Sequence, residues 1–198
     1  MTRTRLLALP IAAVALSAGL TACGGGAELP STKAGEGYDP ATGPAISGTG
    51  YEMHAPKGWT DVTSSVKASQ KQVDQAYASP QAVDNFKPNL NIIIGKDVGS
   101  GTPSDKDFDE GEEQLTSQLK KVGATNVKVQ PRVALDGETA VHVTASASAS
   151  GVEYVTDQYI AIHDGDAYTL TYSFPSSAQE KESQDVKGPS LASFEFTD

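Results

Sequence analysis

The second half of the chain holds four stretches in which apolar and polar side chains alternate, and short turn sequences separate them. These stretches are residues 127–135, 139–150, 152–162 and 168–174. A period of two is typical of strands that bury one face. Asp136-Gly137 and Asp164-Gly165 favour tight hairpins between such stretches, and Gly151 marks a third turn. The sequence therefore predicts an antiparallel meander with one buried face.

The last of these strands also predicts core residues, which fall on one of its sides. They are Tyr168, Leu170, Tyr172 and Phe174. Earlier in the chain, three consecutive isoleucines within residues 90–98 predict a buried strand. Residues 74–79 are a further candidate strand, which ends before Pro80.

Helical spacing marks a segment between these two groups of strands. Four apolar residues recur on one helix face and predict a helix over residues 107–122, with Ser104 or Asp105 as its N-cap. They are Phe108, Leu115, Leu119 and Val122. A closing helix is expected over residues 177–193, although Gly188-Pro189 interrupts its pattern.

The N-terminus has the organisation of an export signal. Arg3 and Arg5 precede an apolar stretch over residues 6–16, and Leu20-Thr21-Ala22-Cys23 follows. A basic start, a short apolar segment and small residues before a cleavage point are typical of a secretory signal. The Leu-x-Ala-Cys end resembles the lipobox of bacterial lipoproteins, which implies a diacylglycerol thioether on Cys23, cleavage before it and acylation of the new amine. We therefore expect residues 1–22 to be a signal peptide and Cys23 to anchor the protein at the extracytoplasmic face of the cell membrane.

This anchor limits the other chemistry of the chain. Cys23 is the only cysteine, so its modification leaves no thiol for a disulfide, a metal or a nucleophile. The formal net charge is −10, and loss of Arg3 and Arg5 with the signal makes it more negative. An acidic surface repels nucleic acid and anionic lipid heads. Nucleic acid is therefore not an expected partner, and the acyl chains must hold the protein to the membrane.

Residues 23–48 are rich in glycine and proline and contain almost nothing apolar. This composition predicts a flexible tether, and an ordered extension packed on the domain is the alternative. The folded domain is expected over residues 49–198, which is long enough for one packed core.

Three motifs follow the lipobox and the Gly/Pro-rich segment in a fixed order. They are Ala55-Pro56-Lys57-Gly58-Trp59, Phe86-Lys87-Pro88-Asn89 and Leu135-Asp136-Gly137-Glu138-Thr139-Ala140. Together they resemble the LpqN/LpqT group of actinobacterial lipoproteins over about residues 48–196. The resemblance implies an α+β fold like that of photosystem PsbP proteins, an α/β/α sandwich with a central, mostly antiparallel sheet. It also implies a binding or assembly domain without catalytic residues or a cofactor.

No metal site is expected from the sequence. Residues 105–111 begin like an EF-hand loop, but Glu110 and Thr116 stand where that loop needs glycine and a bidentate glutamate. An acidic helix start explains the pattern, and any weak calcium binding would be incidental. His54, His142 and His163 have no second histidine at metal-ligand spacing, and strand or turn positions explain all three.

Motifs for catalysis are equally weak. The Ser-x-x-Lys matches at Ser64 and Ser117 lack the accompanying motifs of serine acyltransferases, and there is no Gly-x-Ser-x-Gly sequence. A carboxylate pair for glycoside hydrolysis cannot be singled out among 25 acids. Aromatic residues are candidates for a binding surface, and Tyr154 and Tyr159 fall on opposite faces of one strand. The others are Trp59, Tyr77, Tyr168 and Tyr172.

These observations predict a lipid-anchored envelope lipoprotein that acts as a non-catalytic binding or assembly module. Its expected partner is a protein or an apolar envelope molecule, and the sequence assigns no ligand-binding residue. A hydrolase of envelope glycans or lipids is the alternative, and a surface-display protein is a third reading.

Overall fold

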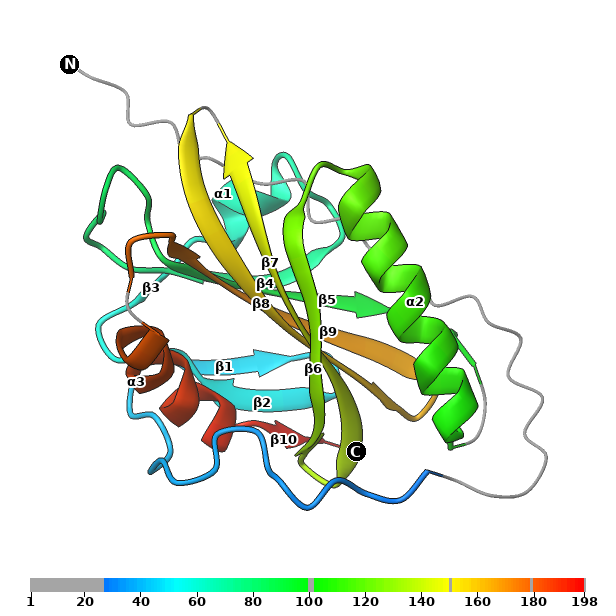
Figure 1. The fold of residues 1–198 in the computed structure, drawn as a ribbon. Coiled ribbons are helices and arrows are strands. Elements are labelled where there is room, and N and C mark those ends of the chain that lie inside the picture. Colours follow the sequence, from blue (N-terminus) through cyan, green and yellow to red (C-terminus); the bar gives the residue numbers. More distant parts are fainter. Residues whose placement is uncertain (1–26, 100–101, 150, 179, 198) are drawn as a thin grey trace.

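The computed structural model describes residues 27–99, 102–149, 151–178 and 180–197. Its centre is a seven-stranded sheet with the order β3-β4-β5-β9-β8-β7-β6, in which every pair is antiparallel (Figure 1). The strands are β3 (Thr60–Asp61), β4 (Val73–Ala78), β5 (Asn89–Gly95), β6 (Thr125–Leu135), β7 (Glu138–Ala149), β8 (Val152–His163) and β9 (Asp166–Pro175).

The predicted meander is confirmed as β6 to β9. Asp136 and Gly137 both have positive φ, and so do Asp164 and Gly165, which is the conformation that a two-residue type I′ hairpin requires. The candidate strands at residues 74–79 and 90–98 correspond to β4 and β5. β5 pairs with β9 in the middle of the sheet, as its isoleucine run predicts.

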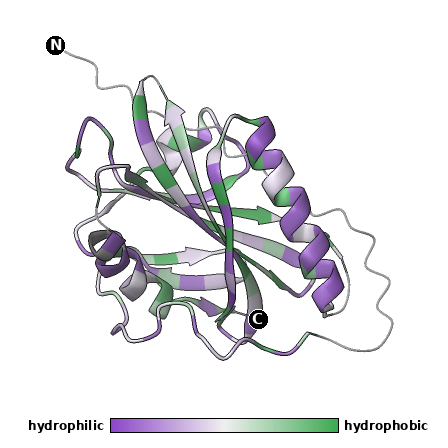
Figure 2. Cartoon of the chain, viewed as in Figure 1, coloured by the Kyte–Doolittle hydropathy of each residue, from purple (hydrophilic) through white to green (hydrophobic). Residues whose placement is uncertain are grey.

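The prediction of one buried face is wrong, because helices cover the second face as well. Helix α2 (Asp105–Lys121) packs its apolar stripe against residues of β7 and β8 that include Val143 and Ile160. Helix α1 (Thr63–Lys67) packs against β4 and β5. Figure 2 shows that the outer surface of α2 is hydrophilic, as expected for a helix that covers a sheet.

The first face carries the larger core. A small sheet with the order β1-β2-β10 and helix α3 (Glu180–Ala192) lie over it. Its strands are β1 (Ala45–Gly48), β2 (Tyr51–His54) and β10 (Glu195–Phe196). Tyr168, Leu170, Tyr172 and Phe174 belong to this core, as predicted. The three layers confirm the α+β class and the sandwich with a central antiparallel sheet.

Both predicted helices form. Ser104 caps α2, because its hydroxyl accepts from the Asp107 N–H while the Asp107 carboxylate accepts from the Ser104 N–H. Helix α3 continues through Gly188-Pro189, so the expected interruption does not occur. Contacts on both sides of α3 account for this, since Leu191 packs into the core and the Tyr38 ring lies against Gly188.

Residues 32–48 differ from the flexible tether that their composition predicts. Lys33 forms a parallel bridge with Ala134 on β6, and residues 45–48 form β1. Ala41 is buried and donates its N–H to the Pro189 carbonyl. The segment is attached mainly by backbone hydrogen bonds and close glycine contacts, so its shortage of apolar side chains does not leave it free. The signal segment 1–22 and Cys23 lie outside the described residues.

Candidate functional site

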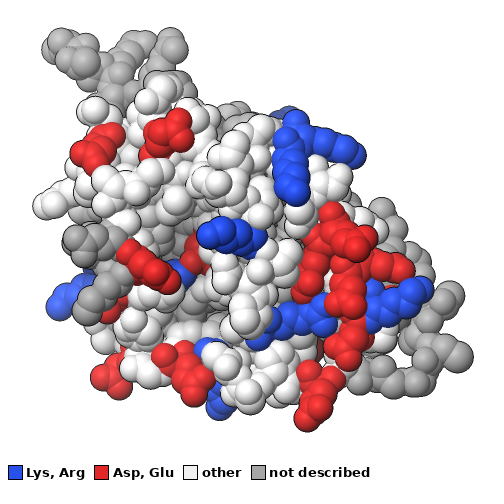
Figure 3. Space-filling view, in the orientation of Figure 1, with Lys and Arg blue, Asp and Glu red and all other residues white. Residues whose placement is uncertain are grey.

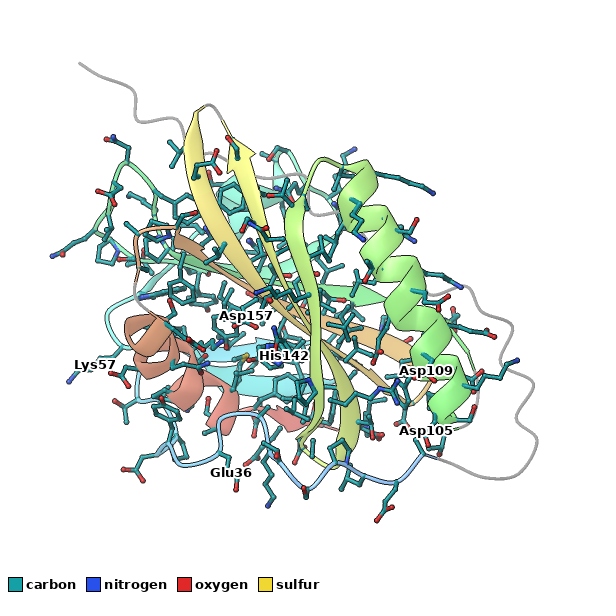
Figure 4. The ribbon with its side chains drawn as sticks, viewed as in Figure 1. Glu36, Lys57, Asp105, Asp109, His142 and Asp157 are labelled. Carbon is teal, nitrogen blue, oxygen red and sulfur yellow. The ribbon has the colours of Figure 1, made fainter. Side chains whose placement is uncertain are left out.

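The structure brings together three ionisable side chains that are far apart in the sequence. His142 on β7, Asp157 on β8 and Lys187 on α3 form one cluster on the face that α3 covers. His142 Nε2 lies 2.6 Å from Asp157 Oδ1, and the Lys187 ammonium donates to Asp157 Oδ2. Figure 4 places His142 and Asp157 close together near the centre of the molecule.

Strand register explains how His142 and Asp157 meet. His142 lies opposite Tyr159, and Asp157 lies opposite Thr144. Opposed residues of an antiparallel pair point to the same face, and the next pair along that face is a diagonal neighbour. His142 and Asp157 are therefore diagonal neighbours, and helix α3 adds Lys187 from above.

Burial changes the proton affinities of this cluster. Burial, with the positive charge of Lys187 nearby, lowers the pKa of His142 to about 4. Burial also lowers the pKa of Lys187 to about 8. At pH 7 His142 is therefore neutral and Lys187 is mostly charged. Because the Asp157 carboxylate can only accept, the single proton of the neutral imidazole lies on Nε2. The other ring nitrogen, Nδ1, is then an acceptor.

Tyrosines surround the charged groups. The His142 ring stacks on Tyr159 with centroids 4.4 Å apart, and the Lys187 ammonium lies 5.8 Å from the Tyr159 ring centroid. The Tyr172 hydroxyl is buried, and the Ser190 side chain lies beside it. Burial raises the pKa of both Tyr159 and Tyr172, so both hydroxyls remain donors at neutral pH.

The cluster is only partly closed to solvent. The Lys187 side chain is 3% exposed, whereas those of Asp157 and His142 are 13% and 16% exposed. Figure 3 shows a hollow on this face, with red and blue atoms inside it, near the position that Figure 4 gives for Asp157. We call this hollow and the His142–Asp157–Lys187 cluster the cleft. It presents the partly exposed His142 and Asp157 side chains to solvent, and polar groups in a hollow suit binding of a partner.

The acidic start of α2 has a structural partner. Arg132 on β6 donates from Nε to Glu112 Oε1 at 2.7 Å and from its terminal nitrogens to Asp105 and Asp109. Figure 3 shows acidic and basic atoms interleaved along this helix. Within the described ranges, no group of three or more His, Cys, Asp or Glu side chains is placed to hold a metal ion.

The remaining candidates take separate places. His54 donates from Nδ1 to the Gly43 carbonyl, and His163 pairs with Glu138 and stacks on Phe196. Ser64 and Ser117 are exposed on α1 and α2, so the structure does not bring them to the cleft. Trp59, Tyr77, Tyr154, Tyr168 and Tyr172 are core residues.

A shallow groove lies between α2 and β6. Its lining is Asp109, Glu112, Glu113, Thr116, Ser117, Lys120 and Val129. It contains Ser117 and Lys120, the second Ser-x-x-Lys pair, but no histidine. The cleft, in contrast, is not predicted by the sequence, in which an ordinary strand position explains His142 and no pattern points to Lys187.

None of the helices in the described ranges has the length and apolar character needed to cross a membrane. Attachment by acyl chains at Cys23 remains a prediction, because that residue lies outside the described part.

Comparisons with known proteins support the fold. No family model matches the sequence, and neither does any curated protein. The cyanobacterial PsbP protein of Synechocystis sp. PCC 6803 matches with a TM-score of 0.50 and 19% identity, over 90% of this chain and 99% of that one. A Bacteroides thetaiotaomicron structure matches with a TM-score of 0.51 and 14% identity; 79% of this chain is covered, but only 49% of the Bacteroides chain.

LpqN of Mycobacterium tuberculosis, described as involved in cell envelope biogenesis, has a TM-score of 0.49 and 15% identity, over 79% of this chain and 86% of LpqN. At these identities the likenesses concern the fold. The chain therefore has a PsbP-like fold, as the sequence resemblance predicts, and membership of the LpqN/LpqT group stays a prediction.

Proposed function

We propose that this chain is a lipid-anchored module of the cell envelope that binds or assembles a partner at the cleft and does not catalyse a reaction. The sequence Leu20-Thr21-Ala22-Cys23 after a basic and apolar start carries the proposal. Acyl chains on Cys23 would hold the PsbP-like domain at the extracytoplasmic face of the membrane.

The packing of the core favours a partner that binds at the surface. The space between the seven-stranded sheet and the layer of α3 is filled by buried side chains that include Tyr51, Tyr172 and Phe194. Tyr51 stacks on Phe194 with centroids 5.7 Å apart. A filled core leaves an acyl chain no room in that layer. A protein partner that contacts the cleft therefore suits the geometry better than an apolar molecule held inside.

The same cleft argues for binding over hydrolysis. A glycosidase needs two carboxyl groups about 5–10 Å apart with separate protonation states. The carboxylate of the cluster among the described side chains is Asp157. One of its oxygens is bonded to His142 and the other to Lys187. Hydrolysis of envelope glycans or lipids remains the alternative function.

Site-specific photo-crosslinking in the native envelope tests the proposal. Thr144 lies opposite Asp157 and is half-buried, so Thr144→p-benzoylphenylalanine places a crosslinker at the cleft. Thr116→p-benzoylphenylalanine, in the groove between α2 and β6, is the matched control.

We expect a defined crosslinked protein from position 144 and none of the same mass from position 116. Identical products at both positions would contradict a partner at the cleft. Turnover of an envelope substrate that is lost in Asp157→Asn would favour the hydrolase.

A further inference from the structure

We propose that residues 32–41 form a strap that keeps α3 seated over the cleft, so that release of the strap exposes Lys187 and opens the cleft. The proposal rests on the proposed function insofar as it takes the cleft to be the binding site. The strap itself is defined by contacts at both of its ends.

One end of the strap is attached to the sheet. The Ala34 N–H donates to the Ala134 carbonyl at 2.8 Å, and the Ala134 N–H donates to the Thr32 carbonyl at 2.8 Å. These bonds form a single parallel bridge at the edge of β6. Edge groups of a sheet pair readily with an extended segment, and such pairing is also reversible because it involves few bonds.

The other end of the strap lies on the outer side of α3. The Ala41 N–H donates to the Pro189 carbonyl at 2.8 Å, and the Tyr38 hydroxyl lies 3.5 Å from Asp185 Oδ1. A Cβ at Gly188 would collide with the Tyr38 ring, and a Cβ at Gly35 would collide with the Ala192 nitrogen. The strap and α3 are therefore in direct contact over two turns of the helix.

Helix α3 depends on such contacts. Gly188 and Pro189 both disfavour a helix interior, glycine through backbone entropy and proline through its missing N–H. Lys187 immediately precedes them, and its ammonium reaches Asp157 only when this turn is helical and lies on the sheet. Strands β7 and β8, with 12 residues each, and β9, with 10, are in contrast long and paired on both sides. The strap and α3 are thus the unit expected to open first.

The strap also occupies a particular place in the chain. It lies between Cys23 and β1 (Ala45–Gly48), so a pull at the lipid anchor acts on the Ala27–Pro103 bond and on the strap before it acts on β1. This order links attachment at the membrane to closure of the cleft.

Amine labelling of the full chain tests the strap. The probe is acetic anhydride at pH 7, with the modification of each lysine followed by mass spectrometry, and exposed Lys57 serves as the internal reference. In Gly35→Ala the added Cβ collides with the Ala192 backbone, so the strap cannot approach α3 as closely. Tyr38→Ala removes the ring that packs against Gly188. Gly37→Ala is the matched control, because Gly37 shares the positive φ of Gly35 but a Cβ there meets nothing within 4 Å.

We expect Gly35→Ala and Tyr38→Ala each to raise the labelling rate of Lys187 about tenfold, because labelling of a buried amine follows the population of the open state. Hydrogen exchange should rise in residues 180–192 and stay unchanged in β7 to β9. Gly37→Ala should leave both readouts as in the unmodified protein.

Equal Lys187 labelling in all variants would overturn the strap, and so would a parallel rise in exchange across β7 to β9. These readouts need no partner. If they hold while the crosslink at position 144 is absent, the proposed function fails and the strap stands.

Discussion

Lys187 and Asp157 form an ion pair that fastens α3 to the central sheet across 30 positions of sequence. The ammonium is almost wholly buried, and Asp157 also holds His142 through its other oxygen. Within the cluster, this ion pair joins α3 to the sheet. Its loss therefore tests whether α3 is positioned as described.

Removal of this ammonium should weaken the fold. In Lys187→Met, Asp157 stays buried without its main cation, which typically costs 3–5 kcal/mol. We expect a loss of about 3 kcal/mol in the free energy of unfolding, near the low end of that range. The loss is limited because His142 can take up a proton and compensate part of the Asp157 charge. Urea denaturation measures the effect.

Two further variants control this prediction. The double variant Lys187→Met with Asp157→Leu should recover most of the stability, because no charge is left buried. Lys57→Met, at an exposed position, should change the free energy of unfolding by less than about 0.5 kcal/mol. A Lys187 variant as stable as the Lys57 variant would show that the pair does not fasten α3.

His142 should make the stability depend on pH. Its pKa is about 4 in the folded protein and about 6.5 in the unfolded chain. Between these values the unfolded chain binds a proton that the folded protein does not. Stability is therefore lost as the pH falls from 6.5 to 4, by at most about 3 kcal/mol.

Chemical denaturation at pH 7, 5.5 and 4 tests this dependence against His142→Gln, which cannot titrate. The difference in free energy of unfolding between the two proteins should shift in favour of the variant as the pH falls. A difference that stays constant over this range would mean that His142 titrates normally.

Arg132 should stabilise the packing of α2 on β6. It contacts three carboxylates, and its guanidinium carbon lies 5.2 Å from the Phe108 ring centroid. Arg132→Met should cost about 1–2 kcal/mol, and the loss should shrink in high salt. Lys106→Met removes the exposed pair with Glu110 and should cost less than about 0.5 kcal/mol. Equal losses in both variants would contradict this account of the acidic cluster.

Burial of both sheet faces gives a further prediction. Val143 and Val129 lie opposite each other on β7 and β6, but Val143 is 1% exposed whereas Val129 is 44% exposed. Val143→Ala should cost about 2 kcal/mol through lost burial and a small cavity under α2. Val129→Ala should cost less than about 0.5 kcal/mol. Similar values for the two would contradict the packing of α2 on this face.

The sequence predicts the strands well and their environment less well. Period-two alternation and the two Asp-Gly turns are local signals, and β6 to β9 follow from them. Burial of the second face is not a local property of the strands, because it depends on how α2, the element before β6, packs across β7 and β8. One signal was available, since Tyr159-Ile160-Ala161-Ile162 is a continuous apolar run that alternation alone does not explain.

The cleft was only half predictable. The turn at Gly151 fixes the register of β7 with β8, and this register places His142 opposite Tyr159 and Thr144 opposite Asp157. Nothing local connects Lys187 to them, because its position depends on how α3 packs on the sheet. The ordered strap is not predictable from composition either, because glycine and proline are as common in a free linker as in a segment held by backbone contacts.

The most direct test of the account is mass spectrometry of the protein from membranes of its native host, with Cys23→Ser as the control. The account predicts a chain that begins at Cys23 and carries a diacylglyceryl thioether and an N-acyl group, whereas Cys23→Ser stays unprocessed. An intact segment 1–22 with a free thiol at Cys23 would contradict the lipid anchor and with it the proposed place of the module in the envelope.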